Sequence, residues 1–158
     1  AYSSYSTGVF TAMRLKSLLV CAAILAFSGA ARADVIHQTS FGGVAIDGYD
    51  AVAYFTQSAA IEGDDAFESD WNGATWRFAS AANKALFDAD PEKYAPQYGG
   101  YCAYAVCQGY TASTVPEAWA VVDDKLYLNF SRRVQRRWER DIPGHILAAD
   151  ANWPAVLS

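Results

Sequence analysis

The dipeptide Asn72-Gly73 constrains the fold of this chain more than any other short segment. Asn-Gly between two runs of strand-forming residues is the strongest local signal for a β-hairpin, because both residues of the tight turn need a positive φ angle. The flanking runs are residues 66–71 and 74–78, and Trp76 and Phe78 lie two positions apart on one face of the second run. We therefore predict a hairpin that packs an aromatic face against a core.

Other segments extend this prediction. Asp123-Asp124 lies between residues 118–122 and 125–130 and predicts a second hairpin. Strands are also predicted within residues 44–55 and over residues 101–108. Capping residues and prolines predict helices over residues 81–87, 91–96, 132–141 and 143–151. The predicted fold class is α+β, with a small antiparallel sheet built from hairpins and short helices packed on it.

The N-terminus has the three-part layout of a secretory signal peptide. A basic start at residues 13–16 precedes an apolar run at residues 18–27 and a small-x-small cleavage motif at residues 31–33. The apolar run is shorter than the roughly 20 residues of a permanent span. We therefore expect a periplasmic or secreted protein with no permanent membrane span after cleavage. Its parts are an upstream extension of unknown role (1–12), a signal peptide (13–33) and one domain with a C-terminal helical extension (34–158).

The charge of the chain excludes one class of partner. It carries 12 Lys and Arg against 17 Asp and Glu, a net charge of −5, and loss of Arg14, Lys16 and Arg32 with the signal peptide would change this to −8. We therefore expect no nucleic-acid partner. Five arginines nevertheless lie within residues 132–140, on two stripes with i, i+4 spacing. Either they form a solvated face, or they bind an acidic periplasmic protein or an anionic membrane surface. The partner-binding candidates are Arg133, Arg136 and Arg137.

Four segments, in this order, resemble the YHS domain family. They are Asp-Gly-Tyr-Asp-Ala-Val-Ala-Tyr-Phe at 47–55, Trp-Asn-Gly-Ala-Thr-Trp-Arg-Phe at 71–78, Asp-Pro-Glu-Lys-Tyr at 90–94 and Gly-Gly-Tyr-Cys-Ala-Tyr at 99–104. The order matches the family from about residue 47 to 98, and the last motif is similar to an exported branch of it. The resemblance implies a small module concerned with metal, copper foremost, with zinc as the other candidate cofactor.

The resemblance also implies that the usual metal site of the family is absent. In metal-binding members cysteines occupy positions that correspond here to Ala53 and, near the end of the aromatic strand, to Ala79 with Asn83. None of these side chains binds a soft metal, since thiolates are the ligands that select copper(I) or zinc. Any metal function must therefore use other residues.

Cysteines and histidines supply the remaining candidates for a metal or ligand site. Cys102 is a soft ligand, a redox-active thiol or a small buried hydrophobe, and Cys107 is a second candidate ligand. His37 and His145 either converge with Cys102 on a metal or lie apart. A Cys102–Cys107 disulfide would need a turn between them. Five residues of extended strand span about 16 Å, whereas bridged Cα atoms lie within about 7 Å.

Asp50 and three tyrosines are the pocket candidates. Asp50 either lines a pocket with Tyr54 and Tyr101 or accepts backbone hydrogen bonds in a turn. Tyr104 lies two residues from Cys102 and is the fourth pocket candidate.

Three functions follow from these residues. The first is a non-catalytic periplasmic binding module concerned with metal or redox homeostasis, and the second is a protein-interaction module that has lost the family's metal site. The third is a thiol-based redox protein that uses Cys102. The sequence contains no nucleophile elbow, phosphate loop or metalloprotease helix, so no catalytic residue is assigned and an enzyme is the less favoured class.

Overall fold

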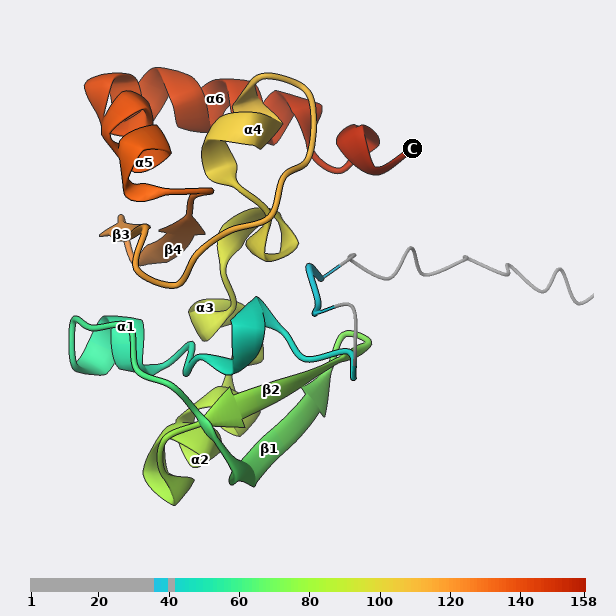
Figure 1. Ribbon diagram of the computed structural model, residues 1–158, viewed down its shortest axis with the longest axis vertical. Coiled ribbons are helices and arrows are strands. Elements are labelled where there is room, and N and C mark those ends of the chain that lie inside the picture. The colour runs from blue at the N-terminus through green and yellow to red at the C-terminus, as the bar shows by residue number, and fades with distance from the viewer. Residues whose placement is uncertain (1–35, 40–41) are drawn as a thin grey trace, which may run out of the picture. The chain divides into compact units, whose positions relative to one another are not determined.

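Short helices and two hairpins make up the described part of the chain, residues 36–39 and 42–158 of the computed structural model (Figure 1). All of these residues belong to one compact unit. None of the helices within them is long and apolar enough to cross a membrane. The elements are η1 (Ile46–Gly48), α1 (Ala53–Thr56), β1 (Asp64–Trp71), β2 (Ala74–Phe78), α2 (Ala81–Ala89), α3 (Pro91–Tyr94), η2 (Gln97–Gly100), α4 (Ala103–Cys107), β3 (Trp119–Val122), β4 (Lys125–Leu128), α5 (Arg132–Trp138), η3 (Glu139–Asp141), α6 (Ile142–Asn152) and η4 (Ala155–Leu157).

Both predicted hairpins are confirmed. β1 pairs antiparallel with β2, and β3 pairs antiparallel with β4. The turn residues Asn72 and Gly73 both have positive φ, as do Asp123 and Asp124. Two successive positive φ angles give a turn whose twist matches that of the strands it joins. The α+β class is confirmed, and the hairpins form two separate two-stranded sheets instead of one.

The predicted helix starts are also confirmed. Ser80 Oγ accepts a hydrogen bond from the backbone of Asn83 at the start of α2, and Ser131 Oγ accepts one from Val134 at the start of α5. Asp90 caps α3, which has Pro91 as its first residue. Each cap provides an acceptor for one of the N–H groups that a helix start leaves without a partner.

Two strand predictions are wrong. Residues 44–55 form η1, α1 and isolated bridges, because Ile46 and Asp47 turn the chain through positive φ. Residues 101–108 form α4 and its flanks. Gly99 and Gly100, both at positive φ, redirect the chain there, and the apolar side chains of α4 pack against α6.

The β3–β4 hairpin lies between two hydrophobic cores. Successive strand side chains point to opposite faces. Leu126 and Leu128 therefore join the core formed by η1, α1, β2 and α2, while Tyr127 joins the core around α4, α5 and α6. In Figure 1 the hairpin is drawn between α4–α6 above and α1–α3 with the first hairpin below. This sharing joins the two cores through one sheet.

Candidate functional site

Asp50 is a buried carboxylate that joins segments distant in sequence. It is fully buried, and its Oδ1 accepts hydrogen bonds from the backbone N–H groups of Val52 at 2.9 Å and Ala53 at 3.2 Å. Its Oδ2 accepts bonds from the Ala79 N–H at 2.9 Å and from Asn83 Nδ2 at 2.7 Å. Asp50 therefore accepts backbone hydrogen bonds, as the turn alternative predicted, and also holds the start of α1 against the β2–α2 junction.

The same contacts show what occupies the positions that the resemblance matched to metal ligands. Ala53, Ala79 and Asn83 each donate a hydrogen bond to Asp50. The fold thus brings these three positions together around a carboxylate whose two oxygens are already satisfied. In this chain the hydrogen bonds of Asp50 join the start of α1 to the β2–α2 junction.

Cys102 and Cys107 lie at opposite ends of α4 and are both free thiols. Cys102 is 1% exposed, and its Sγ accepts a hydrogen bond from the Phe130 N–H at 3.2 Å. Burial raises the pKa of the Cys102 thiol, and nearby backbone N–H groups oppose this only in part. Cys107 Sγ donates to the Tyr104 carbonyl oxygen at 3.0 Å, and burial raises its pKa as well. Since the thiolate is the nucleophile and the metal ligand, both environments disfavour the reactive form.

The two histidines contact different tyrosines. The His145 ring packs on Tyr104, with 5.3 Å between ring centroids, and its Nδ1 lies 2.8 Å from the Trp138 carbonyl oxygen, to which it donates. The His37 ring packs on Tyr101 at 5.0 Å, and burial lowers the pKa of His37 although Asp47 opposes the shift.

No group of three or more His, Cys, Asp and Glu side chains placed to hold a metal ion occurs among residues 36–39 and 42–158. His37, His145 and Cys102 thus do not converge into such a group. The thiols of Cys102 and Cys107 are engaged in hydrogen bonds to protein atoms. The described donors therefore do not fit the three- and four-ligand sites typical of zinc in proteins.

The tyrosines and Asp50 do not line one common pocket. Tyr54 donates its hydroxyl to the Pro116 carbonyl oxygen at 3.0 Å and lines a cavity that includes neither Asp50 nor Tyr101. Burial raises the pKa of the Tyr54 phenol. Tyr101 instead packs on Trp153 as well as on His37. Each tyrosine thus fixes a different pair of segments.

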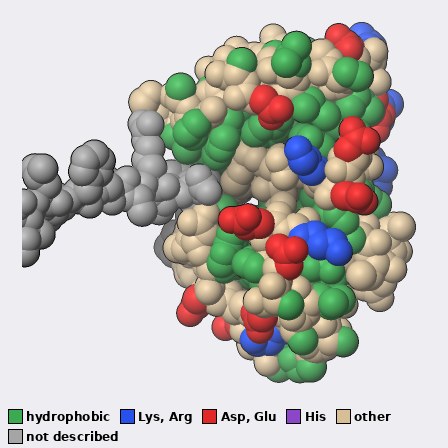
Figure 2. All heavy atoms as spheres, turned by 180° about the vertical axis from the view of Figure 1, so that it is seen from behind, with side chains coloured by type: hydrophobic (Ala, Val, Ile, Leu, Met, Phe, Trp, Pro, Cys, Tyr) green, Lys and Arg blue, Asp and Glu red, His purple; other side chains and the backbone are tan. Residues whose placement is uncertain are grey.

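Five exposed arginines lie on α5 and η3, a stretch that also carries the exposed Glu139 and Asp141. We define the arginine face as Arg132, Arg133, Arg136, Arg137 and Arg140, all exposed. Within the described part of the chain the ion pairs are Arg77–Glu68 and Lys84–Asp88, so no arginine of this face has a carboxylate partner. The acids nearest in sequence have other contacts, since Gln135 donates to Glu139 and Asp141 caps α6. Figure 2 shows acidic, basic and hydrophobic side chains interspersed across one face of the molecule.

A groove beside the arginine face was not predicted from the sequence. It consists of two open pockets of about 500 and 450 Å³, and both are lined by Ser58 and Trp119. The larger pocket is aromatic and the smaller one reaches Arg132, the first residue of α5. Further residues lining the larger pocket are Tyr54, Phe55, Tyr94, Val121, Lys93 and Asp124. No single motif could have revealed the groove, because its walls come from α1, α3 and the β3–β4 hairpin.

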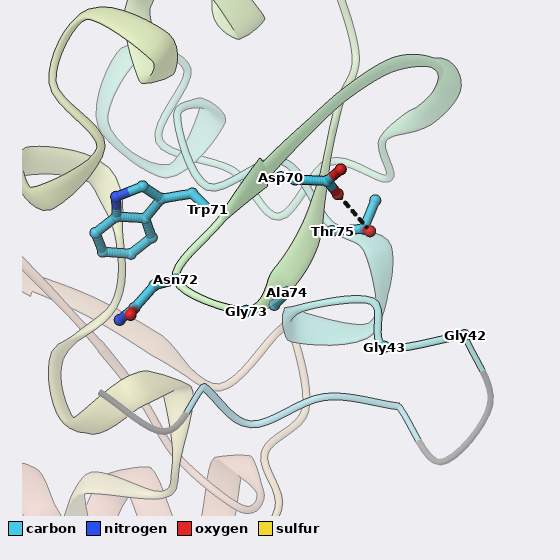
Figure 3. Close-up of a pocket in the computed structure, with 8 residues that line it drawn as sticks. All are labelled: Gly42, Gly43, Asp70, Trp71, Asn72, Gly73, Ala74 and Thr75. Atoms are coloured by element: carbon cyan, nitrogen blue, oxygen red, sulfur yellow. Dashed lines mark hydrogen bonds between the residues drawn. The ribbon is translucent and has the colours of Figure 1, made fainter. Parts of the chain in front are cut away.

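A separate open pocket, of about 360 Å³, lies at the turn of the first hairpin, away from the groove. Figure 3 shows the side chains of Asp70 and Thr75 on one side of this hairpin and those of Trp71 and Asn72 on the other. The polar pair is already satisfied, because Thr75 Oγ1 donates to Asp70 Oδ1 at 2.8 Å. The two polar side chains on that side of the hairpin are thus bonded to each other.

Comparison with known proteins identifies the family of one part of the chain. Residues 52–98 match the family model of the YHS domain. No curated protein and no solved structure matches the chain. The matched segment runs from α1 through α3 into η2, within the range that the sequence resemblance predicted, and ends before the Gly-Gly-Tyr-Cys-Ala-Tyr motif. The chain therefore carries a YHS domain, and residues 52–98 are the segment that belongs to this family.

Proposed function

We propose that this protein is a non-catalytic interaction module, in which the YHS domain is a scaffold and the arginine face binds an acidic protein partner. One observation carries the proposal: five exposed arginines on α5 and η3 have no carboxylate partner among the described residues. The chain as a whole has a net charge of −5, so the positive charge of residues 132–140 contrasts with the rest of the molecule.

The chemistry of arginine supports a protein partner. A guanidinium presents a planar array of donors that matches a carboxylate with two parallel hydrogen bonds. A positive patch on an otherwise acidic protein also orients an approaching acidic partner and speeds its association. Copper or zinc binding has weaker support, because the described cysteines and histidines do not form a three-ligand group.

The proposal includes an exported location. The signal peptide predicted at residues 13–33 lies outside the described residues and stays a prediction. The N-terminal sequence of the protein recovered from an exported fraction tests it, with Asp34 as the expected first residue. A protein that keeps residues 13–33 and stays inside the cell would contradict this location.

Charge reversal on α5 tests the docking surface. We expect Arg133→Glu with Arg137→Glu to weaken binding of an acidic exported partner by about tenfold or more, because attraction becomes repulsion. The measurement is capture from an exported-protein fraction by tagged protein beginning at Asp34, followed by titration of the captured partner at low and high salt.

The matched control reverses two charges elsewhere. Lys84→Glu with Lys125→Glu changes the net charge by the same amount and leaves the arginine face intact. Retained binding in this control, loss in the arginine variant and weakening by salt would support the proposal. Equal capture by wild type and by the arginine variant would refute it.

A further inference from the structure

The groove along Trp119 adjoins the arginine face and has a different chemistry. Its larger pocket is lined by Tyr54, Phe55, Tyr94 and Trp119, of which Phe55 and Trp119 are partly exposed and the two tyrosines are buried behind them. Tyr54 and Trp119 pack against each other with 5.2 Å between ring centroids, and Phe55 packs edge-on against Tyr94 at 5.4 Å. The partly exposed Phe55 and Trp119, held in place by these ring contacts, suit contact with a large apolar side chain.

The charges of the groove nearly balance. Lys93 and Asp124 line the larger pocket, while Arg132 and Glu117 line the smaller one, so each pocket has one acidic and one basic side chain. Selection for a strongly acidic segment therefore comes from the arginine face and not from the groove itself. The groove instead favours an uncharged residue.

Hydrogen bonding fixes the groove and the arginine face relative to each other. Gln135 Nε2 of α5 donates to the Trp119 carbonyl oxygen at 2.7 Å. Arg132 lines the groove and lies on one helical stripe with Arg136. A segment that leaves the groove at Arg132 would therefore meet the guanidinium groups of Arg132 and Arg136, with Glu139, which accepts a hydrogen bond from the same Gln135 amide, beside them.

Building on the proposed function, we infer that the partner binds through an extended segment in which a large aromatic or aliphatic residue is next to a run of acidic residues. The apolar residue occupies the groove beside Trp119, and the acidic run lies on Arg132 and Arg136. The aromatic pocket and the adjoining charge complementarity together select this segment over an acidic segment alone.

Peptide binding tests the inference with the protein that begins at Asp34. The probes are a fluorescently labelled peptide with one phenylalanine followed by a run of glutamates, and the same peptide with alanine in place of phenylalanine. We expect the alanine peptide to bind about tenfold more weakly or worse, because a buried aromatic anchor supplies much of the affinity of such interfaces.

Three variants locate the binding. Thr56→Trp adds bulk to an exposed position that lines the larger pocket, and we expect it to weaken the phenylalanine peptide about tenfold with little effect on the alanine peptide. Ala151→Trp adds the same side chain at an exposed position of α6 that does not line the groove, and we expect no change. Arg136→Glu should weaken both peptides.

The outcomes separate this inference from the proposed function. Equal binding of the two peptides, or no effect of Thr56→Trp, would overturn the groove as anchor site while leaving the arginine face in place. Binding to vesicles of anionic phospholipid with no binding to either peptide would overturn both. No loss in Arg136→Glu, with the groove variant impaired, would overturn the coupling of groove and arginine face.

Discussion

At the scale of single residues, Asp50 shows how the chain joins α1 to the first hairpin. Its carboxylate accepts hydrogen bonds from residues two, three, 29 and 33 positions along the chain. The two local bonds follow from the habit of Asp to accept N–H groups in turns. The two distant bonds were not predictable, because nothing in the local pattern indicates that Ala79 and Asn83 return to this turn.

Asp50→Asn should destabilise the protein markedly. An asparagine has the same shape, but its NH₂ group would face an N–H donor in place of a carboxylate oxygen. An unsatisfied buried donor costs about 1–3 kcal/mol, and more than one is affected, so we expect a loss of about 2 kcal/mol or more in the free energy of unfolding. Urea unfolding of both proteins measures it.

A surface aspartate provides the control for this substitution. Asp70 is exposed and accepts one hydrogen bond, from Thr75 Oγ1. Asp70→Asn should therefore change the free energy of unfolding by less than about 0.5 kcal/mol. Similar losses in the two variants would mean that the four bonds to Asp50 contribute no more than a surface contact.

At the scale of elements, α4 is the segment that sequence reasoning assigned wrongly. Aromatic and β-branched residues at 101–108 favour a strand by propensity, but propensity is a weak guide where tertiary packing decides. Ala103 and Val106 are fully buried against the neighbouring helices, and Asn152 Nδ2 donates to the Val106 carbonyl oxygen at 2.9 Å. The elements with caps or tight turns were predictable because their signals are local.

The helical form of α4 predicts that Cys102 and Cys107 stay unpaired. Residues five apart on a helix have Cα atoms about 8–9 Å apart, beyond the reach of a disulfide. We expect the intact protein beginning at Asp34 to have the mass of the fully reduced form. Cys107, at 8% exposure, should react with iodoacetamide faster than Cys102, at 1% exposure.

Mass spectrometry of the native and the unfolded protein checks both statements. In urea the two thiols should react at similar rates, which controls for intrinsic reactivity. A native mass two units below the reduced value would show a bridge and therefore a different structure of α4. Faster native alkylation of Cys102 than of Cys107 would instead support the redox use of Cys102.

At the scale of the whole molecule, two cores share one hairpin, and Ile36 and His37 lie against one core each. Ile36 packs in the core that contains β2, whereas the neighbouring His37 packs on Tyr101, which lies against the core around α4. The His37 N–H also donates to the Gly99 carbonyl oxygen at 2.7 Å. This contact was not predictable, because nothing in the sequence near His37 indicates that it returns to Gly99 and Tyr101, more than 60 residues further along the chain.

His37 should make the stability of the molecule depend on pH. Burial lowers the pKa of His37 below 6.5, so between the folded-state pKa and 6.5 the unfolded chain binds more protons than the folded one. The contribution of His37 to the free energy of unfolding is therefore fully present above about pH 6.5. It is lost as the pH falls from there through the folded-state pKa. The lowered pKa of Asp88 affects stability only near and below pH 3.8, outside this window.

We expect the urea concentration at the unfolding midpoint to decrease between about pH 7.5 and pH 5.5, and to decrease less in His37→Gln. A variant midpoint that falls as much as that of wild type would show that His37 does not carry this pH dependence.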